Sequence, residues 1–463
     1  MSSAPGRAPS PLGPTPAPDG PPVLRDRALW TGAAVGLVVS ILLTVVRGDA
    51  LWGSSEGVYA LTARQVLDGD DLYGRLIGAQ PPITLLAGIP ALLVSDTIGA
   101  IHAWMGLLQL AGGVAAGVAV RRLTGSPIAT FLAPLAAVSL PWAVNQHGVY
   151  TPELVGLPFL LGGAVAAARP RTVPLGAVLL ALAVFVKLPF VLPAVLVVLA
   201  CADRRRGMVW LAGTGIGLAG FFTLVFGTAM WEQVVLAQGQ SGLHPWSALP
   251  GTVLQSVWSL LGLLAGCALL LRERRTDRWP RDGVQLRVSA ALAAGAVLTW
   301  ASSFKEGTSL NVLVPIELAL IPLAATGFLL AWRRAGRTAY ATDPAIRLAD
   351  RGPLVRLGIL LVSTLTLAQT VAVLVPPHDT FPWTRPGTPP AYGQTANTGV
   401  VDAKRRAAAT CPPDAPFGGL AYYAFLFDRR MPDRQPDTFL TKTAPRLKAV
   451  RARMEADGPV CGG

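Results

Sequence analysis

The residues best suited to chemistry begin with one carboxylate, Glu56, in the segment that follows the first long apolar run. An acid held there could act as a general base that takes a proton from a hydroxyl. The alternative is that Glu56 faces solvent or lies in the first turn of a helix that starts at Ser54 or Ser55. Asp49 is the second carboxylate of this segment. Its place at the end of the apolar run suits an orienting or metal-contacting group better than a base.

Charged side chains also lie within or beside later apolar runs. Lys187 is near the centre of a long run, where an ionisable residue is costly and is therefore a candidate functional group. Glu153 opens another run, and an acid is favoured in the first turn of a helix whatever its function. For Lys305 and Glu306, between two runs, a local ion pair is the alternative to a ligand contact. Glu317 lies inside a run, so its carboxylate requires a buried partner.

The composition indicates a helical membrane protein. Of the 463 residues, 52% are hydrophobic and only 14% are charged, whereas about a quarter of a soluble protein is charged. Apolar runs of about 20 residues recur along most of the chain, and the roughly 10-residue alternating segments of a membrane barrel are absent. The net charge of +13 comes mostly from short basic clusters between the runs. The positive-inside rule explains these clusters, so nucleic acid is not an expected partner.

The basic clusters also predict how the chain crosses the membrane. Arg25 and Arg27 precede the first run, 28–46, so we expect the N-terminus in the cytoplasm and the Glu56 segment outside. The same rule orients the later runs, and it places the C-terminus outside. These runs are 98–120, 128–144, 152–168, 208–228, 253–271, 288–302, 310–332 and 357–375.

Two apolar segments do not fit a single crossing. The run 81–94 is shorter than the roughly 20 residues that a spanning helix needs, so we expect a re-entrant or interfacial helix there. The run 173–200 has Lys187-Leu188-Pro189 at its centre and basic clusters at both ends. We therefore expect two short helices that meet near Lys187. Counting them separately gives about 11 spans.

The two ends of the chain differ from the apolar part, residues 25–376. Residues 1–24 are rich in Pro, Ser, Ala and Gly without periodicity, which predicts a disordered cytoplasmic segment. Residues 377–463 form a polar tail, which we expect outside the membrane. Cys411 and Cys461 of this tail could pair in an oxidising compartment. The tail is small for an independent domain, and packing on the membrane part is the alternative.

After Glu56 the chain shows a definite order of residues: Tyr59, then the turn Gly69 to Tyr73, then Pro81-Pro82. This order resembles the first external loop of the GT-C class of polytopic glycosyltransferases, in particular the bacterial protein-mannosyltransferase-like group. These enzymes carry an acid, an aromatic residue, an amphipathic helix with a Gly-Asp-Leu-Tyr-like turn, and a Pro-Pro that opens the next helix. Many relatives have Lys or His where this chain has Gln80, which removes a cation that would face a lipid phosphate.

The resemblance implies an all-α integral membrane protein of the cell membrane, with a GT-C-like bundle and an external first loop that carries amphipathic helices. It also implies transfer of a sugar, with inversion, from a polyprenyl-phosphate donor to a hydroxyl of an extracytoplasmic glycan or protein. Glu56 would be the base, and Lys187 and Lys305 would hold the donor phosphate. The expected substrate-binding residues are Asp49, Tyr59, Arg64, Tyr73, Gln80, His147, Glu153, Lys187, Lys305, Glu306 and Asn311.

The sequence also bears on other classes of function, through the motifs that it lacks. It has no Walker loop, dinucleotide fingerprint or zinc-ligand cluster, and His147 has no second ligand at metal-binding spacing. No cofactor is therefore expected, but the sequence leaves open whether a divalent cation is required. A transporter or a flippase of lipid-linked sugars is the main alternative, but it should show internal repeats with matching interrupted segments. A membrane scaffold without catalytic activity is a further alternative. In the tail, 428–430 and 433–434 could contact an anionic acceptor glycan or form a solvated charged turn.

Overall fold

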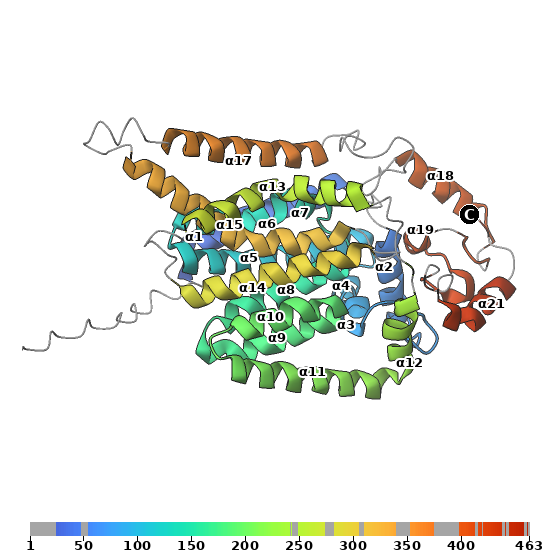
Figure 1. The fold of residues 1–463 in the computed structure, drawn as a ribbon. Coiled ribbons are helices and arrows are strands. Elements are labelled where there is room, and N and C mark those ends of the chain that lie inside the picture. The colour runs from blue at the N-terminus through green and yellow to red at the C-terminus, as the bar shows by residue number, and fades with distance from the viewer. Residues whose placement is uncertain are drawn as a thin grey trace, which may run out of the picture.

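The computed structural model is an elongated bundle of helices that lie side by side, with shorter elements across one end (Figure 1). The structure describes residues 25–47, 54–240, 242, 249–273, 282–304, 310–338, 352–374, 398–412, 415–418, 420–437, 440, 444–457 and 461. Within these ranges the regular elements are helices, and the β pairings are two isolated bridges.

Seven helices are long and apolar enough to cross a membrane, so the chain is a multi-pass membrane protein. Their limits follow the predicted runs within a few residues. The helices are α1 (Arg27–Arg47), α5 (Ile98–Thr124), α11 (Arg204–Phe226), α13 (Leu249–Glu273), α14 (Gly283–Thr299), α15 (Leu313–Thr338) and α17 (Gly352–Leu374).

Shorter apolar helices complete the bundle, and the predicted break near Lys187 is confirmed. The run 81–94 is split into α3 (Pro82–Leu86) and α4 (Ile89–Val94), so it is no single spanning helix. The run 173–200 is split into α9 (Val173–Val186), the 3-10 turn η3 (Leu188–Phe190) and α10 (Val191–Ala200). Lys187 is the extended residue between them, as predicted. Another short helix, α8 (Pro152–Ala167), precedes α9.

The predicted span 128–144 is not one continuous helix. The chain forms α6 (Pro127–Ser139) and then a separate short helix, α7 (Pro141–Asn145), with Leu140 extended between them. Pro141 removes the N–H that would continue α6, and a residue before proline disfavours helical dihedrals. The buried Glu317 of α15 stabilises the new helix start, because its two carboxylate oxygens accept from the main-chain N–H groups of Trp142 (3.0 Å) and Ala143 (2.8 Å).

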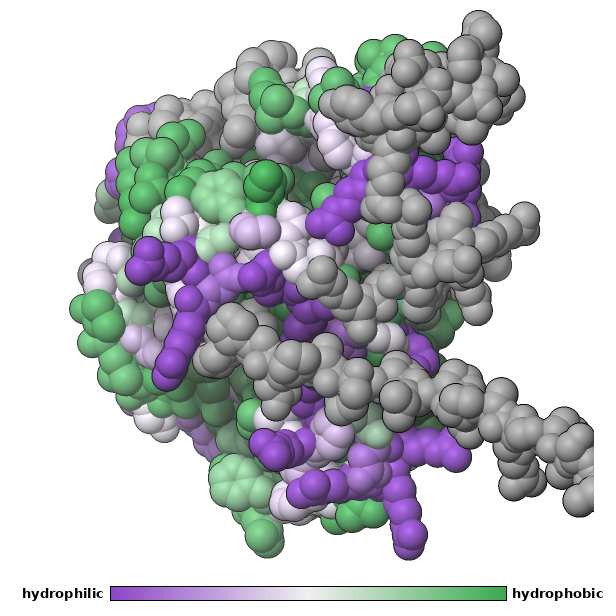
Figure 2. All heavy atoms as spheres, turned by 90° about the vertical axis from the view of Figure 1, so that its left-hand side faces the viewer, coloured by the Kyte–Doolittle hydropathy of each residue, from purple (hydrophilic) through white to green (hydrophobic). Residues whose placement is uncertain are grey.

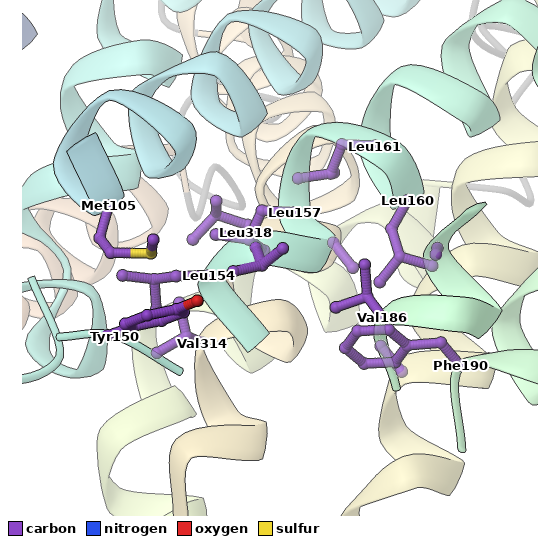
Figure 3. Close-up of a cluster of buried hydrophobic side chains, with 14 of the residues drawn as sticks. Met105, Tyr150, Leu154, Leu157, Leu160, Leu161, Val186, Phe190, Val314 and Leu318 are labelled. Carbon is purple, nitrogen blue, oxygen red and sulfur yellow. The ribbon is translucent and has the colours of Figure 1, made fainter. Parts of the chain in front are cut away.

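Small residues allow the bundle helices to approach closely. Gly163 of α8 and Gly176 of α9 face each other, and a Cβ on either would meet the main chain of the other helix. Large side chains fill the space between other helices. Figure 3 shows Leu154, Leu157 and Leu160 of α8 among buried side chains from α5, α9 and α15. The core therefore holds α8, and with it Glu153, in a fixed position.

One end of the bundle is polar. Figure 2 shows hydrophilic side chains gathered on the end where α11 begins and α5 finishes. Exposed arginines of this end include Arg169, Arg171 and the series Arg204 to Arg206. Basic residues at helix ends of one side are what the positive-inside rule associates with the cytoplasmic face.

The opposite end carries the Glu56 segment and the tail (Figure 1). The Glu56 segment forms α2 (Ser54–Leu67), which lies across this end of the bundle and contacts α3 and α4. Helix α12 (Ala229–Trp231) and a π-helical turn, η4 (Glu232–Ala237), lie at the same end. In the tail, α18 (Thr398–Ala409), α19 (Ala421–Leu426), η10 (Pro432–Arg434), η11 (Pro445–Leu447) and α21 (Lys448–Ala456) are described. Further 3-10 turns are η2 (Pro170–Thr172), η5 (Gln238–Gln240), η7 (Trp300–Phe304) and η8 (Leu310–Val312).

Two features hold the tail in place: a disulfide within the tail and a contact between the tail and α2. Cys411 and Cys461 form a disulfide with their Cα atoms 5.8 Å apart, so the suggested pairing is confirmed. Helix α19 packs on α2, which confirms that the tail packs on the rest of the molecule. The aromatic side chains of Tyr422 and Phe425 are buried in this contact.

Candidate functional site

Glu56 lies in the first turn of α2, and its side chain is fully buried. Oε1 lies 2.9 Å from Nε2 of His102 and accepts the main-chain N–H of Tyr150 at 3.1 Å. The other oxygen, Oε2, is buried and has no hydrogen-bond partner among the described residues. A buried acceptor without a donor costs about 1–3 kcal/mol, so such an atom calls for a functional or solvent partner.

His102 and Tyr150 reach Glu56 from separate elements. His102 is in the second turn of α5, whose start is capped by the Thr97 hydroxyl. Tyr150 lies in the short connection between α7 and α8, and its hydroxyl donates to the carbonyl of Thr84 at 2.6 Å. Sequence reasoning missed both contacts. The available signal for His102 was a histidine within an apolar run.

Tyr59 is one turn after Glu56 on the same side of α2, and its ring packs on that of Tyr150 with centroids 5.6 Å apart. Burial raises the pKa of the Tyr59 hydroxyl well above its usual value, and the negative charge of Glu153 raises it further. The nearby side chain of Gln80 has a smaller, opposite effect on this pKa. Tyr59 is therefore a neutral hydroxyl between the Glu56 side and the Glu153 side of the cluster.

Glu153 and Lys187 form the second charged part. Nζ of Lys187 bonds to Oε1 of Glu153, and only 12% and 3% of these two side chains are exposed. The break between α9 and η3 brings the lysine there, and the first turn of α8 supplies the acid. Oε2 of Glu153 is buried and, within the described part of the chain, has no hydrogen-bond partner. Glu56 and Glu153 thus each keep one carboxylate oxygen without a donor.

The segment between α2 and α3 is held in a strained form. Tyr73 has φ +68°, which is rare for an aromatic residue, and its hydroxyl donates to the carbonyl of Gln80 at 2.5 Å. Gln233 of η4 donates to the carbonyl of Tyr73 (2.7 Å) and accepts from the N–H of Gly78 (2.9 Å). The Tyr73 hydroxyl donates its hydrogen bond to Gln80, so this side chain positions Gln80 and does not face a ligand. The predicted opening of α3 by Pro81-Pro82 is confirmed.

Gly57, next to Glu56, lets the tail come close to α2. A Cβ at this position would overlap the main-chain N and Cα of Tyr422 in α19. No rotamer change can relieve an overlap with the main chain, so only glycine fits while α19 stays in place.

Gly57→Ala should therefore displace α19 and lower the stability of the protein by about 1–3 kcal/mol, the usual cost of overpacking. Gly99→Ala in α5 is the matched control, because a Cβ there meets nothing within 4 Å. Thermal unfolding of the detergent-purified proteins measures the difference, and limited proteolysis reports release of the tail. Equal melting temperatures for the two variants would contradict the close packing of α19 on α2.

The structure brings some predicted site residues together and places others elsewhere. One cluster, which we name the Glu56 cluster, contains the buried residues Glu56, Tyr59, His102, Tyr150 and Glu153 and the half-buried residues Gln80 and Lys187. The His147 ring is hydrogen-bonded to the side chain of Ser40 in α1 and to that of Gln109 in α5. Arg64 pairs with Asp96 at 2.7 Å and donates to the carbonyl of Phe425 in α19.

Asn311 is the one further predicted site residue that the structure describes. Asp49, Lys305 and Glu306 fall outside the described residues, and Asn311 belongs to η8, just before α15. Among the residues that the structure describes, no group of three or more His, Cys, Asp or Glu side chains could hold a metal ion.

An apolar cavity of about 340 Å³ lies between α3, α4, α5, α8 and α11. Its walls include Ile83 of α3, Trp104 of α5, Val155 and Phe159 of α8, and Phe222 of α11. Thr84, next to Ile83, donates to the carbonyl of Val186 at 2.6 Å, and Val186 precedes Lys187. The cavity is therefore near Lys187, the extended residue that follows α9.

Comparison with solved structures shows that the chain has the GT-C fold. Apo ArnT from Cupriavidus metallidurans is similar over 91% of this chain and 88% of its own, with 15% identity and a TM-score of 0.59. ArnT of the same organism bound to undecaprenyl phosphate is similar over 90% and 88%, with 16% identity and a TM-score of 0.54. No protein-family model matches the chain, and no curated protein is similar to it in sequence.

Proposed function

We propose that the protein is a membrane glycosyltransferase that moves a sugar from a polyprenyl-phosphate donor to a hydroxyl of an extracytoplasmic glycan or protein. The observation that carries this proposal is the likeness of nearly the whole chain to ArnT, which binds undecaprenyl phosphate in one of its structures. The Glu56 cluster at one end of the bundle supports it, because acid and ammonium groups there suit sugar transfer from a phosphate.

The donor would lie with its lipid chain in the apolar cavity and its phosphate at Lys187. The cavity has walls of aliphatic and aromatic side chains, which suit a hydrocarbon chain. Lys187 is the nearby ammonium group of the cluster. In the absence of donor, Glu153 compensates its charge; a phosphate that arrives would share the ammonium and supply acceptor oxygens.

Glu56 would act as the base on the acceptor. Its Oε2 would take the hydroxyl proton while the hydroxyl oxygen forms a bond to the anomeric carbon. The bond between that carbon and the phosphate oxygen would break with its electron pair on the phosphate, which leaves with the lipid. One displacement inverts the anomeric carbon. Because Glu56 has no exposed surface, the reaction requires the packing over Oε2 to open for the acceptor.

The proposed function also predicts which end of the bundle faces the cytoplasm. The arginine-rich end would face the cytoplasm, and α2, the Glu56 cluster and the tail would lie outside. The disulfide between Cys411 and Cys461 supports this direction, since disulfides persist outside the cytoplasm.

The test is transfer from defined donors. Membranes that contain the protein, and membranes that lack it, are incubated with radiolabelled polyprenyl-phosphate arabinose, mannose, glucose or galactose. We expect the label of one donor to move to a lipid-free glycan or protein only where the protein is present. Absence of protein-dependent transfer from every donor, together with facilitated movement of an intact donor across the membrane, would replace this proposal by a flippase.

A further inference from the structure

A second cavity, of about 280 Å³, lies between α2 and the tail, away from the Glu56 cluster. It is polar, and four arginines line it: Arg64, Arg429, Arg430 and Arg434. Asp68 and Asp428 are the acids of its wall. We name it the arginine cavity. Arg64 comes from α2, and the other three come from one turn of the tail.

Helix α2 separates this cavity from the Glu56 cluster. Leu61, Arg64 and Gln65, with Asp68 just after the helix, follow the spacing of one helical face. Glu56 and Tyr59 follow the same spacing on another face. The arginine cavity is therefore a separate site, although the same helix forms part of both.

The arginines are held in place by the surrounding structure. Arg434 pairs with Asp70 through Nη2 at 2.7 Å, and its carbonyl accepts from Gln65 at 3.0 Å. Arg64 is fixed by Asp96, and its guanidinium stacks 3.6 Å over the ring of Phe425. A guanidinium has five N–H donors, and one ion pair leaves several of those of Arg434 for a ligand.

The backbone of this turn is strained. Asp428, Asp433 and Arg434 have φ of +52°, +46° and +56°, and they are three of the four non-glycine residues with positive φ in the described part of the chain. Asp457 holds the turn by accepting from the Asp433 N–H at 2.8 Å. A left-handed φ is costly at Arg434, whereas aspartate tolerates it better, and residues with such dihedrals gather at functional sites.

From this geometry we infer that the arginine cavity binds an acidic sugar, that is, a sugar ring that carries a carboxylate or a phosphate. Guanidinium groups suit the anionic group, with paired hydrogen bonds. Gln65, Asp68 and Asp428 beside them suit the ring hydroxyls, and the volume matches a ligand of one or two rings. The inference goes beyond the proposed transfer and does not require it, because it concerns binding alone.

Ligand-observed NMR titration of the full-length protein in detergent tests the inference with glucuronate, glucose 6-phosphate and neutral glucose. We expect the two acidic sugars to bind at least about tenfold more tightly than glucose, since only they form charge-assisted bonds. Galacturonate and trigalacturonate distinguish the source of the ligand. Tighter binding of the trimer assigns the cavity to a unit of a longer glycan, and equal binding assigns it to a free sugar acid.

Two substitutions act in opposite directions. Arg434→Gln should weaken glucuronate binding about tenfold through loss of charge-assisted bonds. Asp428→Asn should strengthen it about threefold, because it removes a negative charge from the wall. Asp428 is 98% exposed, and asparagine tolerates its positive φ, so this variant should fold normally. Arg451→Gln, a change of an exposed arginine paired with Glu455 outside the cavity lining, is the control and should have no effect.

Two results would overturn the inference. The first is equal affinity for glucose and glucuronate. The second is a folded Arg434→Gln protein with the affinity of the wild type. If Arg434→Gln does not fold, Asp428→Asn decides, and an unchanged affinity in that variant refutes the site.

Discussion

Glu56→Gln should lower the rate of sugar transfer by about 10²–10⁴-fold, the usual contribution of a general base. Glutamine has almost the same shape, and its amide oxygen can still accept the Tyr150 N–H that Oε1 now accepts. It cannot take a proton from a hydroxyl at neutral pH. The variant therefore removes the proposed chemistry and leaves most of the packing around α2 in place.

Initial rates with the donor identified by the transfer assay measure this effect, and donor binding is measured on the same preparations. Glu455→Gln is the matched control, because Glu455 is an exposed acid of α21 paired with Arg451. We expect donor affinity to be unchanged in both variants and the rate to fall only in Glu56→Gln. A rate equal to the wild type in Glu56→Gln would exclude Glu56 as the base, and Asp49 would be the next acid to test.

The second large effect is expected at Lys187. Lys187→Met leaves the carboxylate of Glu153 buried without its partner, which should destabilise the protein by about 3–5 kcal/mol. A double variant, Lys187→Met with Glu153→Leu, replaces the whole pair by apolar side chains and should regain most of that stability. It should still fail to bind the donor, because the ammonium group proposed to hold the phosphate is absent.

Thermal unfolding separates the structural effect from the functional one. If the double variant is as stable as the wild type and transfers sugar at the wild-type rate, Lys187 serves only to compensate Glu153. If it is stable and its KM for the donor rises at least about tenfold, the phosphate contact is supported, since a charge-assisted bond is worth about 1.5–3 kcal/mol.

Local signals allowed part of this site to be predicted from the sequence. Lys187 interrupts an apolar run directly before a Leu-Pro pair, and that pattern alone indicates the break between α9 and α10. Pro81-Pro82 marks the start of α3 in the same way. Such features depend on dihedral preferences of neighbouring residues, which the sequence states directly.

Contacts between distant segments could not be predicted in that way. His102 is 46 residues from Glu56, and no periodicity indicates that the second turn of α5 meets the first turn of α2. The break between α6 and α7 had a local signal, Pro141, but the mostly apolar run 128–144 was interpreted as one span. Its stabilising partner, Glu317, lies 175 residues from Trp142. Such pairs are selected by tertiary packing, so a single sequence does not reveal them.

The covalent link between residues 411 and 461 has a practical consequence for anyone who purifies the protein. Buffers with thiol reductants would cut it and free the last segment from the piece that precedes α19. A protein reduced in this way would bind ligands in the arginine cavity more weakly than the intact protein does. Biochemical work should therefore begin with oxidised material and confirm the absence of free thiols at these two positions.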